Sequence, residues 1–123
     1  MADTLTVTTE RVDDIPILLA QQVRMGVPDL LDRHFARHGN RQGISLGALA
    51  TLWLTHMLSE ADHRMSHVRG WAKQGLATLR QCSGQAVAEL DFTDDRLADV
   101  LSALGDDVRW QAFERALNQN LLR

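Results

Sequence analysis

The chain has 123 residues, of which 45% are hydrophobic, and a formal net charge of −3 at pH 7. This size and composition fit one soluble domain with its own core, so we expect a single domain over residues 1–123. A single cysteine, Cys82, excludes an intramolecular disulfide, which makes a cytoplasmic location the expectation. No apolar run approaches the roughly 20 residues that cross a bilayer, and the N-terminus lacks the basic start and apolar run of an export signal. We therefore expect no membrane partner.

Charge is distributed unevenly along the chain. Residues 1–32 balance at −4, residues 33–80 at +5 and residues 81–123 at −4, and all five histidines lie in the basic middle. Because the planar fork of arginine suits phosphate and the potential depends on local charge, this pattern favours a localised anion-binding face. Charge blocks also occur on ordinary solvated surface, so the pattern alone leaves both interpretations open.

The first third of the chain predicts two short helices behind an extended start. Apolar and polar residues alternate in "TLTVT", so residues 1–9 are expected to form a short strand or an extended arm. "DDIPILLAQQVRMG" begins with two aspartates and a first-turn proline and stops at Gly26, as a helix does. "VPDLLDRHFARHG" repeats this plan up to Gly39. The helical spacing places the following residues on inward faces: Ile15, Leu18, Leu19, Val23, Leu30, Leu31 and Phe35.

A third helix is expected to form the centre of the core. Ser45 is a suitable N-cap at its start. Its apolar stripe consists of Leu46, Ala50, Trp53 and Met57. We expect this stripe to be buried and to pack against Trp71 and against Trp110 or Phe113.

The second half predicts three further helices. The first runs through Val68, Trp71 and Leu79 to "CSG", and "QAVAELDF" after it is expected to be extended. Thr93 is an N-cap for "DDRLADVLSALG", and "DDVRWQAFERALNQNLLR" begins with another aspartate pair. The inward residues of the last two helices are Leu97, Val100, Leu101, Leu104, Trp110, Phe113, Leu117 and Leu121. The fold class predicted is an all-α compact bundle of about six helices.

The stretch "HMLSEADHRMSHVRGW", residues 56–71, contains the candidate metal ligands. In one continuous helix the ligands on a single face would be His56, Glu60, His63 and His67. That row would span about 16 Å at a rise of 1.5 Å per residue, so one ion would reach only two neighbours. Ser59 and Asp62 are good N-caps, so we expect the third helix to end near Ser59 and another to start near Asp62. Polar residues at a helix junction more often bond unpaired backbone groups than metal, so no metal and no cofactor are expected.

The sequence lacks a phosphate-binding loop and an activated thiol. It contains no G-x-x-x-x-G-K and no cysteine with an identifiable base. The aspartate pairs at residues 94–95 and 106–107 fall in the first turns of predicted helices, where carboxylates stabilise the helix dipole. We therefore expect a protein that is not an enzyme.

Three stretches carry a family resemblance: "DRHFARHGNRQGISLG", "LSEADHRMSHVRGW" and "FTDDRLADVLSALGDD". With the sequence between them, they make residues 10–123 resemble a domain of unknown function at the N-terminus of certain bacterial insertion-sequence DDE transposases. The resemblance implies that a ribonuclease-H-like catalytic domain follows, in which two aspartates and a glutamate hold divalent metal for strand cleavage and joining. We expect this chain to end before that domain begins, so the resemblance implies no catalytic residue here.

The resemblance and the basic middle together predict a non-catalytic module that contributes to binding the terminal DNA of the mobile element. The cations expected at the DNA are Arg33, Arg37, Arg41, Arg64, Arg69 and Lys73. They would converge if the end of the second helix approached the junction at residues 59–62. For this fragment alone we expect weak affinity, about 10⁻⁴–10⁻⁶ M near physiological salt.

The alternative is an assembly module without DNA contact of its own. Leu121 and Leu122 make the last turn apolar. Such a turn would mediate self-association as a homodimer, or docking onto the transposase catalytic domain.

Overall fold

The computed structural model describes residue 10, residues 12–35 and residues 43–122. These residues contain seven α-helices and one short 3₁₀ helix, and no strand occurs among them. In chain order the elements are α1 (Ile15–Met25), α2 (Val27–His34), α3 (Leu46–Glu60), α4 (Met65–Gln74), α5 (Leu76–Ser83), η1 (Glu89–Phe92), α6 (Asp94–Leu104) and α7 (Asp107–Leu121). The predicted all-α bundle is confirmed, whereas the strand or arm expected over residues 1–9 lies outside the described residues.

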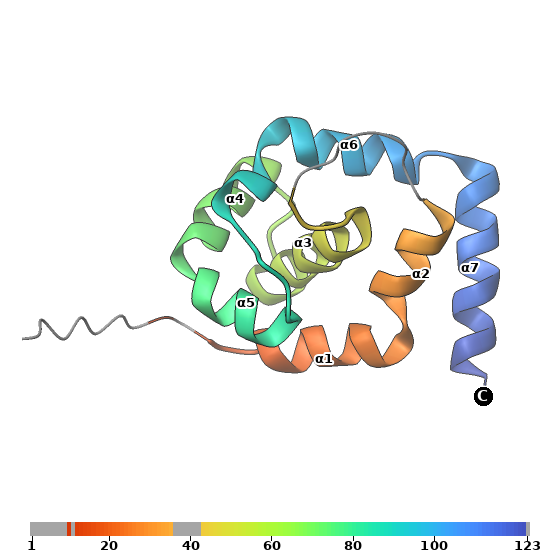
Figure 1. Ribbon diagram of the computed structural model, residues 1–123, viewed down its shortest axis with the longest axis horizontal. Helices are drawn as coiled ribbons and strands as arrows, with labels where there is room; N and C mark the ends of the chain where they lie inside the picture. Colours follow the sequence, from red (N-terminus) through yellow and green to blue (C-terminus); the bar gives the residue numbers. More distant parts are fainter. Residues whose placement is uncertain (1–9, 11, 36–42, 123) are drawn as a thin grey trace, which may run out of the picture.

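The bundle is arranged around α3. In Figure 1, α1, α2, α4, α5 and α6 surround α3, and α7 stands outside them beside α2. Nine of the 15 residues of α3 are buried, which is the pattern of a helix that is enclosed by neighbours instead of lying on a surface. None of the described helices combines the length and the apolar character that a membrane crossing requires.

Side-chain caps start three of the helices. Ser45 accepts a hydrogen bond from the Ala48 amide at the start of α3, at 3.1 Å. At the start of α6, Thr93 accepts from the Arg96 amide at 3.4 Å. The Asp106 carboxylate accepts from Arg109 at the start of α7, at 3.1 Å. These caps satisfy backbone donors that a helix start leaves unpaired, so the predicted capping roles of Ser45 and Thr93 are confirmed.

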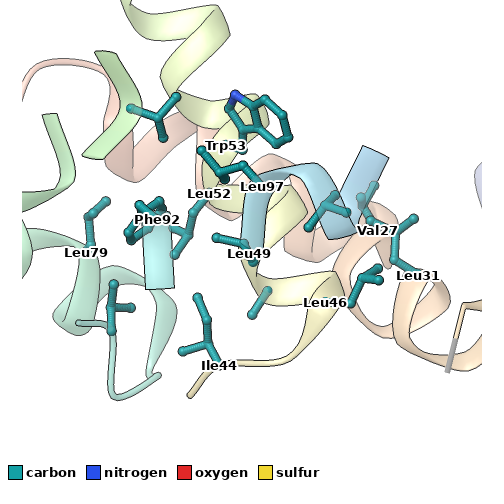
Figure 2. Packing of buried hydrophobic residues seen from close by; sticks show 14 of the residues in the cluster. Val27, Leu31, Ile44, Leu46, Leu49, Leu52, Trp53, Leu79, Phe92 and Leu97 are labelled. Carbon is teal, nitrogen blue, oxygen red and sulfur yellow. The ribbon is translucent and has the colours of Figure 1, made fainter. Parts of the chain in front are cut away.

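The core consists of apolar residues on α3 and on the sides of the other helices that face α3. Figure 2 shows Leu49, Leu52 and Trp53 of α3 near Leu79 of α5 and Phe92 of η1. Trp53 is 5% exposed, as predicted for the stripe of the third helix.

Aromatic rings join α7 to the rest of the bundle. The ring of Phe35, directly after α2, lies with its centroid 6.1 Å from that of Phe113 and 6.4 Å from that of Trp110. Trp110 and Phe113 lie 5.2 Å apart. Phe113 is the one buried residue of α7, so α7 is held mainly by this cluster.

The helix predicted through Val68 and Leu79 is in fact two helices, α4 and α5, and this prediction is corrected. Gly75 interrupts it with φ −122° and ψ 27°. The first turn of α5 has no local side-chain cap. The Glu10 carboxylate takes this role, because it accepts from the amides of Ala77 at 3.2 Å and Thr78 at 2.9 Å.

Several predicted faces are also wrong. Val23 is 54% exposed and Leu101 is 56% exposed, although both were expected to face inward. In place of Val23, α1 buries the neighbouring Gln22, whose side chain donates to the Thr55 hydroxyl on α3 at 2.8 Å. Within "QAVAELDF", residues 89–92 form a 3₁₀ helix and are not extended.

The inward face predicted for α7 is only partly buried. Phe113 is buried, but Trp110 is 40% exposed and Leu121 is 52% exposed. Since α7 lies at the edge of the bundle (Figure 1), Leu121 in its last turn stays exposed, although Asn120 in the same turn donates to the Met25 carbonyl of α1.

Candidate functional site

The junction of α3 and α4 separates the four candidate metal ligands. α3 ends at Glu60, Ala61 adopts a left-handed conformation with φ 51°, and α4 begins only at Met65. The expected break between residues 59 and 62 is therefore confirmed. His63 lies in the linker and His67 on α4, so the four side chains do not form one row.

Asp62 organises this junction. Its carboxylate accepts from the Arg64 amide at 2.9 Å and from the Arg64 guanidinium at 3.1 Å. Its second oxygen lies 2.7 Å from Nδ1 of His67. The backbone N–H of Arg64, then its side chain, hold the pKa of Asp62 well below the usual range. Asp62 thus bonds the backbone of the junction, as expected for a polar residue at a helix start.

His56 is buried in the core. It is 1% exposed, and its Nδ1 has no hydrogen-bond partner among the described residues. Burial lowers its pKa, against the opposite influence of Asp62 and Glu60 and with a smaller contribution from His67. His56, Glu60, His63 and His67 all border one open cleft of about 750 Å³. Even so, within residues 10, 12–35 and 43–122 no three histidine, cysteine or acidic side chains are grouped as metal ligands would be.

The described cations of the predicted DNA site lie on two sides of the molecule. Arg33 is on α2, whereas Arg69 and Lys73 are on α4 and Arg64 directly precedes it. Figure 1 shows α2 and α4 on opposite sides of α3. The expected convergence is therefore not formed between Arg33 and the α4 group. Arg37 and Arg41 lie outside the described residues.

The helices α4 and α5 carry cations and no acid of their own, although the Glu10 carboxylate from another segment binds the first turn of α5. Residues 63–88, which include all of α4 and α5, contain no aspartate or glutamate. Their cations are Arg64, Arg69, Lys73 and Arg80, and all four are exposed. We name this surface of α4 and α5 the basic face. Sequence reasoning missed Arg80, although the acid-free run of 26 residues around it was a readable signal.

Two arginines of the basic face are paired with acids from outside it. Arg64 contacts Asp62 at 3.1 Å, and Arg69 contacts Glu89 of η1 at 3.1 Å. Arg80 donates to the Val87 carbonyl at 2.7 Å. The side chains of Arg64 and Arg69 remain 70% and 48% exposed, so their charges stay accessible to a ligand in solvent.

Comparisons with known proteins add no relative. No protein-family model, no curated protein and no solved structure matches this chain.

Proposed function

We propose that this chain is a non-catalytic helical module of an insertion-sequence transposase, and that its basic face contacts the terminal DNA of the mobile element. The resemblance of residues 10–123 supports the transposase association. The observation that carries the DNA contact is the basic face. Its cations are Arg64 directly before α4, Arg69 and Lys73 on α4 and Arg80 on α5, and residues 63–88 contain no acid. Strand cleavage and joining would belong to the catalytic domain.

The geometry of α4 supports an approach to the DNA backbone. A Cβ built on Gly70, in the middle of α4, meets no atom within 4 Å, so the helix surface is open there. Arg69 and Lys73 lie on either side of Gly70 along this exposed helix. Arginine and lysine contact phosphates first, and these contacts position a protein on a duplex without reading its sequence.

The ion pairs of Arg64 and Arg69 set the strength that we propose. On binding DNA, each guanidinium would give up its carboxylate partner for a phosphate. The net electrostatic stabilisation of the complex is therefore smaller than it would be for an unpaired arginine. We expect a dissociation constant in the non-specific range, about 10⁻⁴–10⁻⁶ M near physiological salt. Sequence selectivity would require base contacts, and these we expect from the rest of the transposase.

Fluorescence anisotropy with a terminal-repeat duplex and a scrambled duplex, at low and moderate salt, tests the proposal. The triple variant Arg64→Ala, Arg69→Ala, Lys73→Ala should bind more weakly. Its salt slope should fall by up to about one unit for each lost phosphate contact.

A matched control removes three exposed arginines from other helices: Arg24→Ala, Arg109→Ala and Arg115→Ala. It changes the net charge equally, and we expect it to weaken binding less. If both triple variants lose the same DNA affinity, the loss depends only on net charge, and a localised binding site is contradicted. Absence of binding at low salt would refute the DNA contact itself.

A further inference from the structure

The polar cleft at the α3–α4 junction lies directly beside the basic face. Its volume of about 750 Å³ falls within the range of about 300–1,000 Å³ that ligand sites occupy. Four residues of α4 at helical spacing line one wall of the cleft: His67, Gly70, Trp71 and Gln74. Arg69 and Lys73 form the adjoining strip of the same helix. The cleft and the basic face are therefore neighbouring surfaces of α4.

Arg64 belongs to both surfaces. It is a cation of the basic face, and it also lines the cleft. Its side chain is 70% exposed, so it is accessible to a ligand from solvent. A phosphate that Arg64 holds would lie at the cleft, and a group linked covalently to that phosphate would lie within reach of the cleft walls.

The walls of the cleft combine planar rings with hydrogen-bonding groups. The rings are the half-buried indole of Trp71 and the exposed imidazoles of His63 and His67. Glu60 offers a carboxylate acceptor, and the amide of Gln74 both donates and accepts. These groups match a flat heterocycle that carries donors and acceptors on its edge. A nucleobase has this chemistry, since proteins hold unpaired bases by stacking on aromatic side chains and by hydrogen bonds to the base edge.

One wall of the cleft contains a polar atom that the described chain leaves unused. His56 borders the cleft and is 1% exposed. Its Nδ1 has no hydrogen-bond partner among the described residues, and its ring packs against the Trp71 indole. Buried polar atoms are normally bonded to protein or to ordered water. An unpaired one at the wall of a cleft is an independent indication of a polar ligand there.

We infer that the cleft takes an unpaired nucleobase of the DNA whose phosphates contact the basic face. The inference rests on the proposed DNA contact and adds the class of DNA, because a base within an intact duplex is paired and stacked and cannot enter a protein cleft. The position of the cations argues for this occupant: Arg64, Arg69 and Lys73 stand beside the cleft, where the phosphates of the same strand would lie. Stacking tolerates every base, so we expect a preference for unpaired DNA without a preference for sequence.

Fluorescence anisotropy at low salt with three labelled DNAs tests the inference. The first is a blunt duplex, the second adds a short single-stranded tail of deoxythymidines, and the third adds an abasic tail of equal length. The abasic tail has the same phosphates without bases, so it separates base contacts from charge. We expect the thymidine tail to bind at least about fivefold more tightly than the abasic tail, which is the lower end of what stacking of one base contributes. Equal affinity for both tails would overturn the inference.

Gly70→Leu tests whether the cleft holds the base. A Cβ at Gly70 meets no atom within 4 Å, and leucine favours a helix more than glycine does, so the variant should fold, as circular dichroism will verify. The added side chain would stand in the cleft, and the preference for the thymidine tail should disappear. The matched control is Ser66→Leu, at an exposed position of α4 that does not line the cleft. It should keep the preference, and the same result for both variants would contradict the inference.

Thymidine monophosphate as a competitor distinguishes a base within DNA from a free nucleotide. The free nucleotide lacks the neighbouring phosphates that Arg69 and Lys73 would hold. At about 1 mM it should therefore leave the tailed duplex bound. Displacement at that concentration would assign the cleft to free nucleotides and would overturn the inference.

The three DNAs also separate this inference from the proposed function. If the blunt duplex binds and the two tails are equivalent, the DNA contact stands and the cleft takes no base. If the thymidine tail binds and the blunt duplex does not, the cleft is supported and the contact with duplex DNA is refuted. If none of the three DNAs binds, both proposals are refuted.

Discussion

The imidazole of His56 packs edge-on against the indole of Trp71, with ring centroids 5.0 Å apart and an angle of 68° between the rings. This contact joins the last turns of α3 to α4 and lies beside the α3–α4 junction. Because His56 is almost fully buried, a positive charge on its ring would have to form largely out of water.

The burial of His56 predicts that the free energy of unfolding depends on pH. Burial lowers the pKa of His56 below its usual value of about 6.5. Between the two pKa values the unfolded chain binds more protons than the folded one, so the free energy of unfolding falls as pH decreases below about 6.5. Urea unfolding at about pH 7.5 and about pH 5.5 measures this loss.

The variant His56→Gln should show a smaller loss over the same interval, because it removes the titrating group. His63→Gln, in the exposed linker, is the control and should keep the wild-type pH dependence. An unchanged pH dependence in His56→Gln would show that burial of this histidine is not the cause.

Truncation of the central tryptophan should be strongly destabilising. Trp53→Ala removes a side chain that is 5% exposed in the middle of the core. Loss of a buried aromatic costs about 3–5 kcal/mol of unfolding free energy, from lost burial and from the cavity left behind. Denaturant titration followed by circular dichroism measures it. Trp110→Ala, at 40% exposure, should cost less, and a reversed order would contradict this description of the core.

A buried carboxylate ties the start of α3 to η1 and α6. Asp91, 2% exposed, accepts from the Ile44 amide at 3.3 Å and the Ala88 amide at 2.8 Å, and from the Arg96 guanidinium at 2.6 Å. Asp91→Ala should reduce the free energy of unfolding by about 3–5 kcal/mol, because it removes the buried acceptor that binds the amides of Ile44 and Ala88 and the guanidinium of Arg96. Asp95→Ala, at an exposed position of α6, is the control, and an equal effect would refute this role of Asp91.

Zinc should not stabilise the protein. A structural zinc site needs four ligands, whereas His56 is buried beside Trp71 and the oxygens of Asp62 are already bonded. We expect stoichiometric zinc to leave the melting temperature unchanged. A rise that saturates at one equivalent would instead indicate a site, since a ligand that binds the folded state stabilises it.

Helix starts and stops were predictable where the chemistry is local. Gly26 ends α1 with φ 83°. Ser45 caps α3 by accepting a hydrogen bond from the amide of Ala48, which is only three residues further along the chain. The break at Gly75 was not predictable, because its cap comes from Glu10, 67 residues away from Ala77. The exposure of Val23 has a similar cause. The spacing of apolar residues identifies the faces of a helix that could be buried. Which of these faces is buried depends on where the neighbouring helices pack.

The candidate site was predictable to a smaller extent. The break between α3 and α4 was correctly predicted near residues 59–62, because Ser59 and Asp62 are residue types that favour helix starts. The sequence did not indicate that α2, which carries Arg33, and α4, which carries Arg69, lie on opposite sides of α3. Nor did it indicate that Glu89 pairs with Arg69, 20 residues away. These relationships depend on how the helices pack, and no spacing along the chain encodes them.

The contact of Glu10 with α5 also gives a reporter for events before α1. The amides of Ala77 and Thr78 belong to the first turn of α5, where amides have no carbonyl partner within their own helix and exchange their hydrogens readily. Here the Glu10 carboxylate accepts from both of them. Hydrogen exchange at these two amides therefore reads out whether the Glu10 carboxylate is bound to α5.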